Sequence, residues 1–286
     1  SLIGWFIGLQ NATVPLKMVI TTNITNILLS LTFVLIFQMQ INGIALASVV
    51  AEIIGMIIGF IYVWKELQKF QGKWIYKEIV RLNAYKRFIQ ININLFLRTI
   101  ALIFTFAFIT AQGARFGGFI LGANALLMNL QNLLAYVLDG FAHAAEALVG
   151  KAVGKKDTRL FKSAVHICLK WSVYIALIFA LIYILTGKYI ISLMTHHQNI
   201  RDIAIEYLPW IIISPIVSVW SFLYDGVFVG ATRSRDMRNA MLASLFLVFL
   251  PSWYFLQPLE NHGLWLAFTL FMFSRGLSMH LLYKRI

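Results

Sequence analysis

The chain has 286 residues, of which 60% are hydrophobic and only 12% are charged, and its mean hydropathy is +0.79. Water-soluble globular domains carry about 25% charged residues, so this composition excludes that class and indicates an integral membrane protein. The formal net charge of +13 does not indicate nucleic-acid binding, because the Lys and Arg residues gather in particular connections between apolar segments, as a membrane topology requires.

Apolar segments of about 20 residues recur along the chain and predict membrane-crossing helices, since outer-membrane strands would be shorter and would alternate in hydrophobicity. After a short stub at 1–10, the predicted spans are 15–37, 43–64, 90–113, 119–149, 163–186, 203–230, 238–257 and 262–283. The predicted fold class is therefore all-α, a polytopic transmembrane helix bundle with eight full spans.

Basic residues predict the orientation of these spans, because cytoplasmic connections are enriched in Lys and Arg. Every second connection between spans lies on the same side of the membrane. One of these two sets of connections, together with the chain ends on its side, holds 19 of the 24 Lys and Arg residues. The largest groups lie at 65–87 and 151–170. We expect the carboxyl tail, and the chain end that contains Ser1, to be cytoplasmic.

The longest polar stretch connects the second and third spans. Residues 67–89 alternate charged side chains with Trp74, Ile75 and Tyr76, which predicts an amphipathic segment that lies along the cytoplasmic interface between two halves of the protein. A solvated linker with no other role is an equal alternative.

An internal repeat supports this division into halves. Gly4-Trp-Phe-Ile-Gly8 resembles Gly226-Val-Phe-Val-Gly230, which lies 222 residues later in the chain. The segment 42–47 resembles 261–267, and its Gly43 matches Gly263 at a similar separation of 220 residues. Both members of each pair have the same orientation, so the repeat is parallel, with a twofold axis along the membrane normal. Residues 1–66 then close one half, residues 90–286 form a second half of six spans, and we expect some four spans before Ser1.

Ionisable residues inside the span 119–149 are the first candidates for function. Asp139, His143 and Glu146 are spaced four and three residues apart, so they share one face of a helix. An unpaired charge at the bilayer centre costs at least about 2.5 to 3.5 kcal/mol, which favours a protein interior or a water-filled path. Alternatively, Asp139 only holds two helices together and Glu146 only offsets nearby lysines.

Arg98 lies near the middle of its span and needs a carboxylate, for which Asp139 and Asp225 are the candidates. We expect these three residues to approach one another, with side chains facing the interior of the second half. One acid would pair with Arg98, and the other would remain free to titrate. Glu52 and Arg275 lie closer to the predicted cytoplasmic ends, where snorkelling or a structural ion pair explains them.

Other polar and small residues carry weaker signals. Asn124 and Gln131 precede Asp139 in the same span and could line a cleft, although hydrogen bonding between helices explains such residues more often. Glycine pairs predict close helix packing; they are Gly55/Gly59, Gly113/Gly117 and Gly226/Gly230. Motifs of zinc peptidases, P-loop ATPases and serine hydrolases are absent from the sequence, and Asp139 lacks the surrounding motif that an intramembrane aspartyl protease would need.

An ordered series of segments carries a family resemblance. GWFIGLQNATVP, TTNITNILLSLTFVL, NGIALASVVAE, AYVLDGFAHAAEALVGKAVGKKD, YDGVFVGATRSRDMRN and NHGLWLAFTLFMFSRGLS closely resemble the DinF-like branch of the MATE (multidrug and toxic compound extrusion) transporters. The resemblance implies that residues 1–66 are the end of helix 4 with helices 5 and 6. It implies that 67–89 connect two lobes and that 90–286 are helices 7 to 12, the second lobe.

The resemblance also implies a function, that of a secondary antiporter rather than an enzyme. It would export cationic or amphiphilic organic compounds in exchange for protons or sodium ions, as a multi-pass protein of the bacterial cytoplasmic membrane. Sodium-coupled relatives use an acid near the position of Arg98, and this departure favours protons. The expected partners are the lipid bilayer, a small organic substrate and protons, with no nucleic acid, cofactor or metal, and we expect a monomer.

The predicted ion-coupling and cleft residues are Asp139, Asp225, Arg98, Glu146, His143, Asn124 and Gln131. Two alternatives stay open: a flippase of lipid-linked precursors from the related superfamily, which would need a more cationic cleft, and a non-transporting membrane protein such as an intramembrane aspartyl protease or a scaffold.

Overall fold

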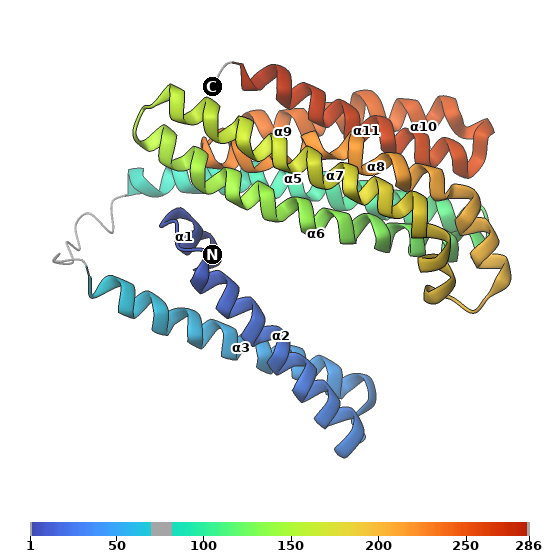
Figure 1. Ribbon diagram of the computed structural model, residues 1–286, viewed down its shortest axis with the longest axis horizontal. Helices are drawn as coiled ribbons and strands as arrows, with labels where there is room; N and C mark the ends of the chain where they lie inside the picture. Colours follow the sequence, from blue (N-terminus) through green and yellow to red (C-terminus); the bar gives the residue numbers. More distant parts are fainter. Residues whose placement is uncertain (1, 70–81, 285–286) are drawn as a thin grey trace. The chain divides into compact units, whose positions relative to one another are not determined.

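The computed structural model describes residues 2–69 and 82–284, and all regular elements in these ranges are helices (Figure 1). This confirms the predicted all-α class. The chain divides into two compact units, Ser1–Arg81 and Leu82–Ile286. Most of the predicted interfacial segment 67–89 falls on residues 70–81, which lie outside the described residues.

The first unit is a helical hairpin preceded by a short helix. It consists of α1 (Leu2–Gly8), α2 (Thr13–Leu31), a π-helical continuation η1 (Thr32–Ile36) and α3 (Gln40–Leu67). A methyl group added to Gly55 would lie 2.2 Å from Thr22 Oγ1 of α2, so the missing side chain lets α2 and α3 approach closely. The predicted packing role of Gly55 is therefore confirmed.

The second unit holds the remaining helices. In chain order they are α5 (Leu82–Arg115), α6 (Gly118–Gly154), α7 (Thr158–Met194), α8 (Gln198–Gly230), α9 (Ser234–Ala243), the π-helix η2 (Ser244–Phe249), α10 (Leu250–Leu256), the 3-10 turn η3 (Gln257–Leu259) and α11 (Glu260–Tyr283). Tight turns join these helices. Gly117 has φ of 120° between α5 and α6, a conformation that glycine adopts without steric cost.

Helix α8 is the central helix of this unit. Within its most apolar stretch 67% of the residues are buried, against 22–33% for the other spans of the unit, and it packs against α6, α7 and α11. Pro209 and Pro215 lie inside α8, where each removes a backbone donor. Such breaks are tolerated in membrane helices because neighbouring helices, side chains and local adjustments of the backbone satisfy the freed groups.

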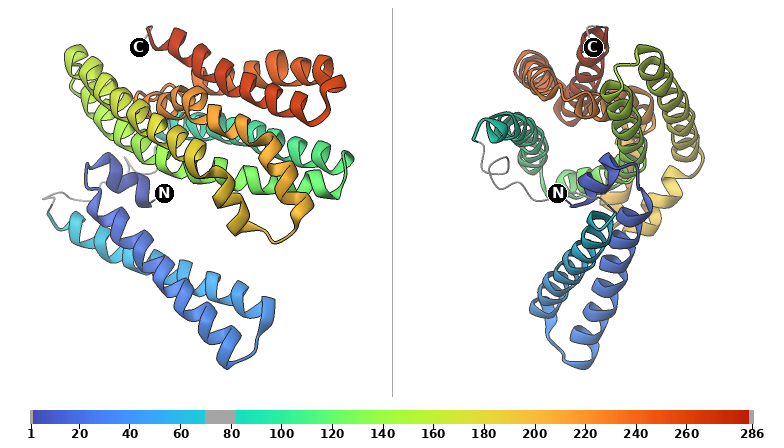
Figure 2. Two further views of the ribbon diagram at one scale, coloured as in Figure 1. Left: turned by 45° about the vertical axis from the view of Figure 1, so that its right-hand side comes forward. Right: turned by 90° about the vertical axis from the view of Figure 1, so that its left-hand side faces the viewer.

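Seven segments of the described residues are long and apolar enough to cross a membrane, one fewer than the eight spans predicted. The predicted spans 238–257 and 262–283 belong to a single apolar segment of 50 residues, Ser234–Tyr283. A straight helix of that length would extend about 75 Å, more than twice the hydrocarbon core. The chain instead turns back at η3 (Figure 2), where Glu260 has φ of 48°, and α11 packs along α10, η2 and α9.

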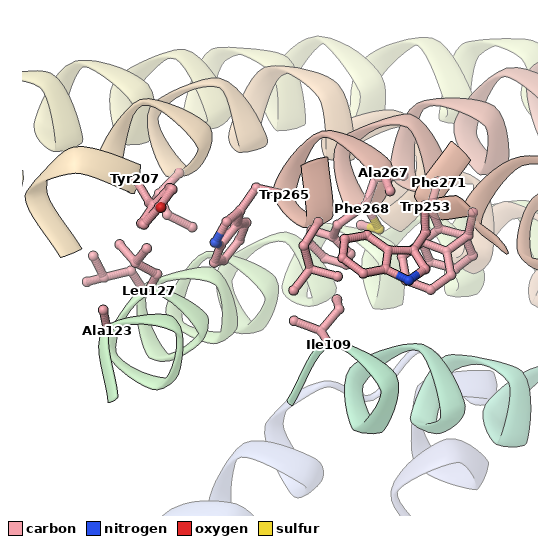
Figure 3. Close-up of a cluster of buried hydrophobic side chains, with 14 of the residues drawn as sticks. Ile109, Ala123, Leu127, Tyr207, Trp253, Trp265, Ala267, Phe268 and Phe271 are labelled. Atoms are coloured by element: carbon pink, nitrogen blue, oxygen red, sulfur yellow. The ribbon is translucent and has the colours of Figure 1, made fainter. Parts of the chain in front are cut away.

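An aromatic core holds this hairpin against the other helices (Figure 3). Trp253 of α10 and Phe271 of α11 lie in one cluster with Ile109 of α5. Phe249 and Phe271 have ring centroids 5.8 Å apart, an edge-to-face contact that aromatic rings favour. The outward faces are also apolar: Leu185, Leu247 and Phe255 are each more than 70% exposed. Lipid must cover such faces, and the protein is therefore a multi-pass membrane protein.

Candidate functional site

A buried carboxylate in the second unit binds two arginines. Asp225 of α8 accepts hydrogen bonds at Oδ2 from Nη2 of Arg98 in α5 and from Nη2 of Arg275 in α11. The prediction that Arg98 pairs with Asp139 or Asp225 is confirmed, and Asp225 is the partner. Three helices that are distant in the sequence therefore meet at one side chain.

The burial of this cluster is unequal among its members. Arg275 is 1% exposed and Asp225 is 9% exposed, whereas the Arg98 side chain is 20% exposed. The Arg275 guanidinium also lies 5.9 Å from the centroid of the Phe222 ring, a cation–π contact. Two positive charges face one negative charge, so the cluster carries a net charge of about +1 in the membrane-spanning part of the protein.

The structure decides between the two explanations that the sequence allowed for Arg275. Arg275 is not a snorkelling side chain but half of a structural ion pair, the other explanation that its position allowed. It lies eight residues from the end of α11, or about 12 Å along the helix axis, and it points to a carboxylate on α8. An Arg in an apolar span was a visible signal, but the sequence does not show which acid another helix presents to it.

Glycines bring the backbone of α8 onto α6 beside this cluster. A methyl group added to Gly226 would lie 2.0 Å from the Ala142 carbonyl oxygen, and one added to Gly230 would lie 2.5 Å from that of Glu146. The predicted close-packing role of this pair is confirmed. Because Gly226 follows Asp225 directly, the same contact holds the carboxylate next to the polar face of α6.

The polar face of α6 is only partly as predicted. His143 Nδ1 lies 3.4 Å from Glu146 Oε2, so these two residues share a face. Asp139, however, is exposed and is not part of the buried cluster, and the expectation that it faces the interior of the second half and not lipid stays a prediction. It forms no hydrogen bond or ion pair with the residues that the structure describes, yet it lies within electrostatic range of Asp225, Arg98 and Arg275.

Asn124 and Gln131 lie in contacts between helices. Asn124 and Asn261 of α11 exchange amide hydrogen bonds of 2.8 and 3.1 Å, and Trp265 Nε1 donates to Asn124 Oδ1 at 2.9 Å. Gln131 accepts a hydrogen bond from the Ser214 hydroxyl of α8. Both residues are 2% exposed. Their hydrogen bonds join helices, which is the alternative to a cleft-lining role that the sequence analysis gave for them.

A second polar contact flanks the buried cluster and was missed from the sequence. The Tyr224 hydroxyl lies 2.6 Å from His280 Nδ1 of α11, so adjacent residues of α8 reach two different positions on α11. An aromatic residue beside an acid in an apolar span was its only signal. Among the described residues, no group of three or more His, Cys, Asp and Glu side chains is arranged to hold a metal ion.

Comparisons with known proteins agree with this architecture. The MatE family model matches residues 95–255. The DNA damage-inducible protein F of Escherichia coli K12 is 39% identical over 99% of this chain and 62% of its own length. Protein DETOXIFICATION 42 of Arabidopsis thaliana is 24% identical over 96% of this chain and 52% of its own length.

Among solved structures, a mutant form of the Vibrio cholerae MATE transporter VcmN superposes with a TM-score of 0.88 at 18% identity, over 99% of this chain and 64% of that one. At this identity the likeness shows a shared fold. The chain thus spans about half to two thirds of the length of the relatives it matches.

Proposed function

Because this chain belongs to the MatE family, we propose that it acts in secondary active efflux, exporting cationic or amphiphilic organic compounds across a membrane in exchange for protons. The observation that carries the proposal is the grouping of Asp225, Arg98 and Arg275 beside an acid, Asp139, that has no such partner. A proton-coupled carrier needs one carboxylate that can gain and lose a proton while the surrounding charges stay fixed.

The two carboxylates have different roles in this proposal. Asp225 is the fixed partner in this proposal, because two guanidinium groups donate to it and each would lose its counter-charge without this carboxylate. Asp139 is exposed and near these charges, so it takes up and releases the proton. Protonating Asp139 changes the local charge by one unit, and this change would bias the helices between two arrangements, as alternating access requires.

Protons suit this site better than sodium ions. A sodium site requires several oxygen ligands around one position, whereas the carboxylate nearest the centre of the cluster is engaged by two cations. The resemblance to MATE transporters also implies that Arg98 lies near the position where sodium-coupled relatives have an acid, and this supports protons.

We further propose a bacterial cytoplasmic membrane as the location, with the carboxyl end of α11 in the cytoplasm. The likeness to the Escherichia coli protein supports the bacterial membrane. The concentration of Lys and Arg between α6 and α7 and after α11 supports the orientation.

The test replaces Asp139 with Asn in the protein expressed from its own gene. We expect ethidium efflux from D139N cells to lose its dependence on the proton gradient, because an amide cannot exchange a proton at this site. D139E should keep the dependence, and D202N, at an exposed acid near the other end of α8, serves as the matched control. If D139N efflux still responds to a protonophore like the unmodified protein, the coupling role of Asp139 is wrong.

A flippase of anionic lipid-linked precursors is the second candidate, and Arg275 is the observation that favours it. Two arginines near one carboxylate make the second unit more cationic than Arg98 alone indicated. Proteoliposomes distinguish the two functions: organic cations that drive proton movement support the antiporter, and translocation of a fluorescent polyprenyl diphosphate without a proton gradient supports the flippase.

A further inference from the structure

A basic cavity lies at one end of the second unit, and none of its lining residues belongs to the cluster of Asp225, Arg98 and Arg275. It has a volume of about 500 Å³ and is formed where the turn between α6 and α7 meets the end of α11. Lysines enter it from three places in the sequence: Lys156 from the turn, Lys162 from the first part of α7, and Lys284 from just beyond α11. The packing of the unit therefore gathers three positive charges around one hollow.

Acidic residues do not neutralise this hollow. Asp157 is the one acid among its lining residues, and its Oδ1 accepts a hydrogen bond of 2.9 Å from the backbone N–H of Leu160. That carboxylate caps the amino end of α7. None of the three lysines forms an ion pair with a residue that the structure describes, and three lysines against one aspartate leave the cavity a formal net charge of +2.

Aromatic and aliphatic groups complete the wall. Phe161 and Tyr283 stack with ring centroids 5.7 Å apart and an interplanar angle of 18°, and Val153, 39% exposed, lies beside them. Tyr residues such as Tyr283 are enriched at the level of the lipid headgroups. A ligand in the cavity would thus meet lysines at one end and apolar surface at the other.

We propose that this cavity binds the phosphate headgroup of an anionic phospholipid from the same leaflet, with its glycerol and upper acyl chain against Phe161 and Val153. The mixed wall favours a lipid over a free anion, because inorganic phosphate would leave the apolar half of the cavity unused. In the orientation proposed above the cavity faces the cytoplasmic leaflet, whose anionic lipids bind basic pockets between helices. This site is separate from the proposed transport function.

Lys156 offers an additional observation about the turn. Its φ is 54°, in the left-handed region that favours glycine. Replacing it with glycine would relieve backbone strain while removing one of the three charges. The variant K156G therefore separates a ligand-binding role from a structural one.

The experiment measures lipid retention by native mass spectrometry of the whole chain in detergent, with phosphatidylglycerol or phosphatidylcholine added. We expect the unmodified protein to retain one phosphatidylglycerol at least tenfold more tightly than phosphatidylcholine. The variant K156Q/K162Q/K284Q should lose this preference, and a Lys→Arg triple variant should keep it. The control K86Q/K170Q/K188Q removes three exposed lysines elsewhere and should bind like the unmodified protein.

Three outcomes would overturn the proposal. Equal retention of the two lipids by the unmodified protein would show that the cavity does not select anionic headgroups. Undiminished phosphatidylglycerol binding by the Gln triple variant would place any lipid site elsewhere. Displacement of the lipid by an equal concentration of inorganic phosphate would show a site for a soluble anion.

K156G should weaken phosphatidylglycerol binding without lowering the melting temperature of the lipid-free protein, and a lower melting temperature would show a structural role.

Discussion

Asp225 holds two arginines that have no other carboxylate within hydrogen-bonding distance among the described residues. Its second oxygen, Oδ1, is buried and has no hydrogen-bond partner among them. The arrangement resembles other buried ion triads, in which removal of one member is more damaging than replacement of the whole group. Loss of the Asp225 carboxylate is therefore expected to affect the stability of the fold.

Replacing Asp225 with Asn should destabilise the protein by about 3 to 5 kcal/mol, because Arg98 and Arg275 would then repel each other without a counter-charge. Thermal unfolding in detergent, followed by circular dichroism, measures this loss. The matched control is D236N, whose partner Arg233 lies 3.6 Å away on an accessible surface, and which should cost less than about 1 kcal/mol. Equal melting temperatures for D225N and the control would contradict the structural role of the cluster.

At the scale of the helices, two acid–glycine steps that look alike in the sequence differ in their packing. Asp225-Gly226 lies at the crossing of α8 and α6, where Gly226 touches the Ala142 carbonyl. Asp139-Gly140 is exposed, and a methyl group on Gly140 would meet nothing within 4 Å. Only the first step depends on the absence of a side chain.

These two glycines allow a matched pair of substitutions. G226A should cost at least about 1 to 3 kcal/mol, because its methyl group would overlap a backbone atom that cannot rotate away. G140A should be neutral or should stabilise the protein by about 0.5 to 1 kcal/mol, since alanine restricts the unfolded chain and favours the helix. The melting temperatures of the two variants measure the difference, and a G226A protein as stable as G140A would contradict the close crossing of α6 and α8.

At the scale of the molecule, the antiparallel helices of the second unit place its connections at two opposite ends. The turn between α6 and α7 and the end of α11 share one end and meet at the basic cavity. The turn between α7 and α8, which contains His196, lies at the other end. From the distribution of Lys and Arg we proposed above that the first end lies in the cytoplasm.

Single cysteines test this orientation. In a variant that replaces the buried Cys168 with Ala, a membrane-impermeant maleimide should label H196C in intact spheroplasts. It should label K155C only after the membrane is permeabilised. The cysteine-free variant controls for background labelling, and the reverse pattern would invert the proposed topology.

The sequence by itself determined the membrane class, the helical fold and nearly all of the spans, because hydrophobicity and length along the chain decide whether a segment can cross a bilayer. It also determined that Arg98 requires a carboxylate, since an unpaired charge in hydrocarbon is costly. Positions along a helix axis follow directly from residue numbers, so candidate residues at a similar depth could be recognised in advance.

Only the tertiary structure decided which of these candidates meet. Rotation of each helix about its axis, and the choice of neighbour, depend on packing between distant segments, such as the crossing of α8 and α6 at Gly226. That packing pairs Asp225 with both Arg98 and Arg275, and it leaves Asp139 exposed. The same packing folds the segment Ser234–Tyr283 into a hairpin and brings three lysines around one cavity. These contacts join residues that are distant in the sequence, so the periodicity of any single segment cannot predict them.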